Sequence, residues 1–175
     1  MSNNETEPEN IVDSDKQNYV NGIDFPQPFD EYAIALCASA RRHVCILSPQ
    51  LDHTAFDTAG LADALSALAR DSRQSDIRIL VSDIQGIVTR GHRLLELSRR
   101  LPSKVHIQRL DEHPQWNGEN CVIRDRSGVL ALPGGAASGA FFEPDSRARA
   151  QQYLELFNSL WNCSVPDPAL RALHL

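Results

Sequence analysis

Apolar and polar positions along the chain repeat with two periods, and their order predicts an α/β domain. Within 25–42, apolar side chains recur at spacings of three and four, which defines one stripe of a helix. The next stretch, 43–48, is a continuous apolar run before Pro49, as in a strand buried on both faces. Two more helix and strand pairs follow, with helices over 58–73 and 91–102 and strands over 76–83 and 104–110. This order predicts parallel strands connected by right-handed crossovers, with helices covering the sheet.

The second half of the chain adds a hairpin and a long amphipathic helix. Residues 120–125 and 128–133 form two apolar runs, and we expect two antiparallel strands joined across Arg126 and Ser127. Segment 144–164 then places its apolar residues on one helical stripe, namely Ala150, Tyr153, Leu154, Phe157, Leu160 and Trp161. The sequence therefore predicts one α/β domain with a mixed sheet flanked by helices.

The first 24 residues differ in composition from the rest of the chain. They contain too few apolar groups to offset the entropy of ordering, so we expect residues 1–24 to be a disordered acidic arm. They carry six Asp or Glu and one Lys, a charge of −5 within a total of −6. Residues 25–175, the expected folded domain with a C-terminal helix and tail, therefore sum to −1. Leu170 and Leu173 are expected to dock that tail.

Composition excludes several classes of protein. The chain has no apolar run of the roughly 18 residues that a membrane span needs, and its acidic start differs from a signal sequence, so a cytoplasmic location is expected. A nearly neutral folded part makes nucleic-acid binding an unfavoured prediction. We find no phosphate-binding loop, dinucleotide fingerprint or HExxH motif and expect no cofactor. Without a CxxC pair, the cysteines are expected to be reduced core thiols: Cys37, Cys45, Cys121 and Cys163.

The hairpin carries a resemblance to a known family. The element order over about residues 28–164, with a hairpin strand that ends in Asp125, resembles one half of the phospholipase D superfamily. That family carries an HxKxxxxD motif on this hairpin, in which one histidine attacks phosphorus and the lysine holds phosphate oxygens. With Asp125 as the motif acid, the histidine position falls on Gly118 and the lysine position on Asn120. The family's GSxN segment would fall on 134–137, which lacks its serine and asparagine.

These departures predict that catalysis by the family route is absent. The chain resembles an uncharacterised bacterial phospholipase-D-like domain, and we interpret it as a non-catalytic binding or regulatory module in which Asp125 is a motif remnant. An aspartate that enters a tight turn also commonly binds the local backbone, so a purely structural Asp125 stays open. The resemblance implies pairing, as a homodimer or by docking to a protein partner, and associates such modules with acetyltransferases.

The preferred binding site is a set of cationic residues at the start of the third helix. Residues 90–109 carry a charge of +5, and Arg90, His92 and Arg93 stand where backbone N–H groups of a helix start could hold phosphate. The alternative is a basic helix face in contact with solvent.

Polar residues at the carboxyl ends of the strands suggest a second chemistry. Asp52, His53 and Asp83 are weak candidates for a metal site, because the spacing lacks a recognised ligand signature. The alternative function is a phosphodiesterase or a phosphatidyl- or nucleotidyl-transferase-type enzyme with a relocated active site, which would use His92 or His113 with Asp125, assisted by a metal at Asp52 and Asp83. A third hypothesis is a protein interaction scaffold without a small ligand.

Overall fold

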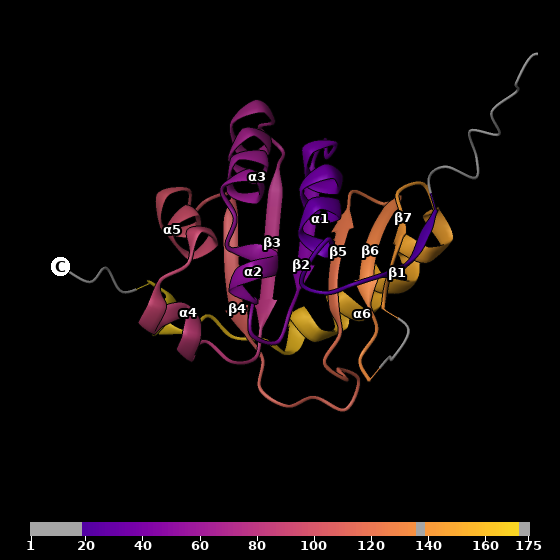
Figure 1. Cartoon of the computed structure of the whole chain (residues 1–175). Coiled ribbons are helices and arrows are strands. Elements are labelled where there is room, and N and C mark those ends of the chain that lie inside the picture. The colour runs from indigo at the N-terminus through magenta and orange to yellow at the C-terminus, as the bar shows by residue number, and fades with distance from the viewer. Residues whose placement is uncertain (1–18, 136–138, 172–175) are drawn as a thin grey trace, which may run out of the picture.

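Seven strands form one mixed sheet in the computed structural model of the chain, which describes residues 19–135 and 139–171. The strand order is β1-β7-β6-β5-β2-β3-β4, and helices cover both faces (Figure 1). The strands are β1 Val20–Ile23, β2 His43–Leu47, β3 Asp76–Val81, β4 Val105–Arg109, β5 Asn120–Arg124, β6 Gly128–Leu132 and β7 Ala140–Glu143. This architecture confirms the predicted mixed α/β sheet.

The half of the sheet built from β2, β3 and β4 is parallel, as the sequence predicts. Helix α1 Phe29–Ala38 precedes β2, α3 Ala59–Asp71 lies between β2 and β3, and α5 Arg93–Arg100 lies between β3 and β4. Side-chain caps mark where α3 and α5 begin. The Thr58 hydroxyl, for example, accepts the Leu61 N–H at the start of α3.

Two short helices interrupt segments for which the hydrophobic pattern predicts no helix. They are α2 His53–Phe56 and α4 Gln85–Arg90. Each follows the carboxyl end of a strand, where an aspartate accepts backbone N–H groups of the first turn. One or two turns are too short for an apolar stripe to mark a helix.

The sheet separates two apolar layers. On one face, α1, α3 and α5 pack over Val44 and Ile46 of β2 and the matching positions of its neighbours. On the other face, α6 Arg147–Cys163 packs over Cys45 and Leu47 (Figure 1). Residues of β2 alternate between two buried faces, which confirms that this strand is central.

The expected boundary of the N-terminal arm is wrong by a few residues. Val20–Ile23 form β1, which pairs antiparallel with β7 at the edge of the sheet. Neither strand was predicted, because both are four residues long and β1 has only one buried residue. Residues 1–18 of the predicted arm and Leu173 lie outside the described residues. Leu170, in α7 Pro168–Arg171, is buried as expected.

All four cysteines are free thiols, most of them in the core. Cys37, Cys45 and Cys121 are buried as expected, whereas Cys163 at the end of α6 is exposed, so the expectation of a core thiol is wrong there. Burial raises the pKa of the Cys37 and Cys45 thiols to about 12, so both stay protonated at neutral pH. Over the described part of the chain, no helix combines the length and apolarity needed to cross a bilayer.

Candidate functional site

The hairpin brings Asn120 to the carboxyl end of β2. Strand β5 pairs antiparallel with β2 in a register that sets Cys121 opposite Leu47, so Asn120 lies beside Ser48. The buried Ser48 hydroxyl donates to Asn120 Oδ1 over 2.6 Å and accepts the Leu51 N–H over 3.0 Å. The side chain at the family's lysine position is therefore neutral and bonded to the protein's own core.

The loop before β5 leaves the family's histidine position without a side chain. Gly118 is exposed and has a φ of +82°, a left-handed conformation in which a histidine would be strained. The loop is braced by Glu119, whose carboxylate accepts the Asn117 N–H over 2.7 Å. A Cβ at Gly134 would collide with the Asn117 carbonyl, so the two loops meet at backbone contact. This backbone does not present a nucleophile where the motif would.

Asp125 lies at the opposite end of β5. Its carboxylate accepts the backbone N–H groups of Arg41, Arg42 and His43 over 3.0, 2.9 and 2.9 Å. Its own N–H donates to the His43 carbonyl over 2.8 Å. Burial alone would raise the pKa of Asp125, but the hydrogen bonds from those three N–H groups outweigh it and lower the pKa below its usual value.

Asp125 therefore fastens the β5–β6 turn to the loop between α1 and β2. A strand of five residues separates it from Asn120 by about 17 Å, at roughly 3.3 Å per residue. His92 and His113 belong to the carboxyl edge, as does Asn120, and Asp125 belongs to the amino edge. The structure thus does not bring either histidine to Asp125, and the catalytic pairs considered from the sequence are not formed.

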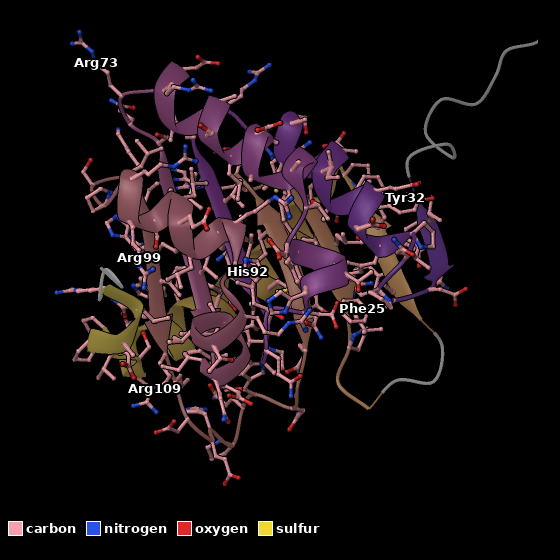
Figure 2. All side chains as sticks on the ribbon, turned by 60° about the vertical axis from the view of Figure 1, so that its left-hand side comes forward. Phe25, Tyr32, Arg73, His92, Arg99 and Arg109 are labelled. Carbon is pink, nitrogen blue, oxygen red and sulfur yellow. The ribbon has the colours of Figure 1, made fainter. Side chains whose placement is uncertain are left out.

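His92 is a structural residue at the start of α5. Its ring is 2 % exposed, its Nδ1 accepts the Leu94 N–H over 3.1 Å, and its Nε2 donates to the Leu51 carbonyl over 3.0 Å. Burial lowers the pKa of His92 to about 4, so the ring is neutral at neutral pH. His92 lies within the body of the domain near the start of α5 (Figure 2). Both ring nitrogens are already bonded within the protein.

The carboxylate of Asp57 already occupies the start of α5, where an external anion was expected to bind. The Arg93 N–H donates to Asp57 Oδ1 over 2.9 Å, and its guanidinium donates to the Asp57 carbonyl over 3.0 Å. Burial would raise the pKa of Asp57, but the Arg93 hydrogen bond and charge lower it. Arg90 lies elsewhere, in a surface pocket of about 300 Å³. The structure does not combine Arg90, His92 and Arg93 into one anion site.

The three weak metal candidates do line that same pocket, together with Arg90. Asp52 accepts the Thr54 and Ala55 N–H groups, Asp83 accepts the Gln85 N–H, and His53 donates to the Gly91 carbonyl over 2.9 Å. Among the described residues, no three His, Cys, Asp or Glu side chains are arranged to hold a metal ion. Asp52 and Asp83 instead stabilise the turns on which they stand, and His53 binds the backbone of the segment before α5.

The carboxyl edge of the parallel strands is strongly acidic, a property that a sum along the chain does not reveal. Segments 48–57, 82–90 and 110–119 converge there and hold six Asp or Glu against one Arg. Arg93 and Arg109 pair with two of these acids, Asp57 and Asp111, which leaves a formal charge of −3. A negative edge of this size repels a phosphodiester.

The strand order, the hairpin register and helices on both faces define a phospholipase-D-like fold. Nuc from Salmonella typhimurium, a phospholipase D family member, aligns with a TM-score of 0.61 at 14% identity, over 85% of this chain and 97% of its own. NucT from Helicobacter pylori aligns with a TM-score of 0.59 at 14% identity, over 85% and 99%. TrmBL2, an archaeal chromatin protein described with a novel mode of DNA binding, aligns with a TM-score of 0.60 at 15% identity. That alignment covers 85% of this chain and 53% of TrmBL2.

The sequence itself places the chain in a family. Residues 26–173 match the family described as a domain of unknown function (DUF7931), and the chain belongs to that family. No curated protein matches the sequence.

Two residues that matter at this edge escaped the sequence analysis. Ser48 and Asp57 act through partners that are 72 and 36 positions away, Asn120 and Arg93. No local signal marks such pairs, because the fold alone decides which loops meet.

Proposed function

We propose that this chain is a non-catalytic phospholipase-D-like module that binds a partner instead of hydrolysing phosphodiesters. One observation carries the proposal: Gly118 and an Asn120 bonded to buried Ser48 occupy the positions that the family resemblance assigns to the nucleophile and its lysine.

The size of the chemical loss supports the same conclusion. Removing one charge-stabilising donor typically costs about 10²–10³ in rate, and removing the nucleophile of a catalytic unit costs on the order of 10⁶. The acidic carboxyl edge adds repulsion of a phosphodiester anion. TrmBL2, an archaeal chromatin protein described with a novel mode of DNA binding, indicates that a similar fold can serve binding.

A phosphodiesterase assay tests the proposal. The full chain is incubated with bis(p-nitrophenyl) phosphate, with Mg²⁺, with Mn²⁺ and with a chelator. We expect no release of nitrophenol above the buffer rate under any of these conditions.

Variants distinguish intrinsic activity from a contaminant. His53→Gln and His113→Gln alter histidines of the carboxyl edge, and His43→Gln is the matched control at the exposed start of β2, on the opposite edge. Turnover that disappears in either carboxyl-edge variant and persists in the control would overturn the proposal in favour of a relocated active site.

The proposal includes association with a second copy or with another protein, since the family resemblance covers only one half of a paired enzyme. Light scattering of the purified chain measures its mass directly. A dimer mass supports self-pairing, whereas a monomer at all concentrations leaves docking to a different protein as the form of association.

A further inference from the structure

The amino edge of the parallel strands carries the opposite charge from the carboxyl edge. Segments 39–43, 70–76, 99–104 and 124–127 meet there, and we call them the basic edge. They hold nine Lys or Arg against three Asp, a formal charge of +6. The nearly neutral folded domain is therefore strongly polarised from one edge of its sheet to the other.

Two of the three acids of the basic edge are bound by groups inside the protein, and the third, Asp71 at the end of α3, is exposed. Asp125 is bonded to three backbone N–H groups. Asp76 pairs with Arg78 over 2.8 Å and lies 3.7 Å from His106. These contacts leave little negative charge to cancel the arginines that face solvent.

Four exposed arginines supply the outward charge: Arg41, Arg42, Arg73 and Arg126. Within the described parts of the chain, none of their side chains makes an ion pair or a hydrogen bond. Figure 2 shows Arg73 extending away from the body of the domain beyond the end of α3. Their guanidinium groups are thus available to an external anion.

The sheet topology arranges these charges in a row. Arg126 stands on the β5–β6 turn, Arg41 and Arg42 precede β2, and Arg73 precedes β3. Lys104 precedes β4, and its ammonium group donates to the Ser72 and Arg73 carbonyls. Neighbouring strands lie about 4.8 Å apart, so the row from β5 to β4 spans roughly 14 Å.

We propose that the basic edge binds the phosphate backbone of a nucleic acid. One strand of a duplex presents a phosphate every ~3.4 Å along the axis, so ~14 Å of cationic row faces about four phosphates. Guanidinium groups match phosphate oxygens in a bidentate geometry. The proposal goes beyond the proposed function, because it concerns the edge opposite Gly118 and Asn120. It also replaces the expectation that nucleic acid is an unfavoured partner, which rested on net charge alone.

Fluorescence anisotropy with a labelled duplex of about 20 base pairs tests this surface, using the full chain at about 50 mM salt. For about four phosphate contacts, we expect the logarithm of the binding constant to fall with the logarithm of salt concentration with a slope near −3 to −4. A single strand of the same length distinguishes duplex from single-stranded backbone as the preferred source of phosphate.

Charge-matched variants locate the contact. Arg73→Gln/Arg126→Gln removes two charges from the basic edge, and Arg90→Gln/Arg93→Gln removes two exposed charges from the opposite, carboxyl edge, where α4 ends and α5 begins. We expect the first variant to bind on the order of tenfold or more weakly, with its salt slope reduced by about 2, and the control to bind as the parent does. Thermal melting confirms that both variants fold.

Three results would overturn the proposal. The first is that neither the duplex nor the single strand binds at about 50 mM salt, where phosphate contacts are favourable. The second is that the control variant weakens binding as much as the basic-edge variant does. The third is that the chain binds a polyglutamate peptide and does not bind nucleic acid. The last result would identify an acidic protein segment as the partner.

Discussion

Replacing Asp125 with alanine should lower the stability of the fold, because this carboxylate has a structural role. The substitution removes an acceptor from the N–H groups of Arg41, Arg42 and His43, which converge on one carboxylate over 2.9–3.0 Å. Leaving a buried N–H without a partner costs about 1–3 kcal/mol, but this site is half-exposed and water can replace part of the loss. We therefore expect the free energy of unfolding to fall by about 2–4 kcal/mol.

Backbone conformation adds to the cost for alanine. Asp125 has a φ of +49°, in the left-handed region that asparagine and aspartate tolerate better than other residues with a Cβ. Asp125→Asn keeps that tolerance and one acceptor oxygen, so we expect it to lose about 1–2 kcal/mol, less than alanine. Urea unfolding at neutral pH, followed by circular dichroism, measures both variants against the parent.

The pH dependence gives an independent check. The pKa of Asp125 is lower in the folded protein than the unfolded value near 3.9, so its stabilisation is complete above that value and is lost as pH falls through the lower folded pKa. Asp125→Asn should lose this part of the acid sensitivity. An alanine variant as stable as the parent, within about 0.5 kcal/mol, would refute the structural role argued for this carboxylate.

Two further predictions concern the carboxyl edge. Because the pKa of His92 is about 4 when folded and near 6.5 when unfolded, the unfolded chain binds a proton first, and the free energy of unfolding should decrease as pH falls from about 6.5 to 4. The decrease is on the order of 3 kcal/mol. Urea titrations at several pH values test it, and a His92→Gln variant whose free energy of unfolding depends on pH as steeply as that of the parent would contradict the prediction. Gly134→Ala should lower the free energy of unfolding by more than about 3 kcal/mol, because the new Cβ would collide with the Asn117 carbonyl. Gly22→Ala is the control: its Cβ would meet no heavy atom within 4 Å, so any loss there comes only from the left-handed backbone conformation. Thermal melting compares the two, and equal loss would exclude the loop contact as the cause.

Local patterns determined most of the secondary structure. The stripe of Phe29, Ala33, Leu36 and Cys37 is buried on α1, and the apolar run at Val44–Leu47 is a central strand. These features follow from spacings between residues close in sequence, so periodicity alone predicts them. The departures at Gly118 and Asn120 could likewise be identified from the sequence, since they depend only on residue type and spacing.

Pairing between distant segments could not be predicted in the same way. Strand β1 exists because Val20 and Ile23 meet Phe142 and Ala140, which lie over a hundred residues further on. The structural roles of Asp125 and His92 likewise depend on partners 82–84 and 41 positions away. An aspartate or a histidine has several possible roles, and its partners select one.

The distribution of charge shows the difference most clearly. Composition determined that the folded domain is nearly neutral, and in sequence Arg73, Arg126 and Arg41 belong to unrelated segments. The strand order β5-β2-β3-β4 gathers the loops that carry them at one edge and the acidic loops at the other. A sum over the sequence has no direction, whereas parallel strands have two distinct ends, so only the folded sheet converts the same charges into a basic and an acidic edge.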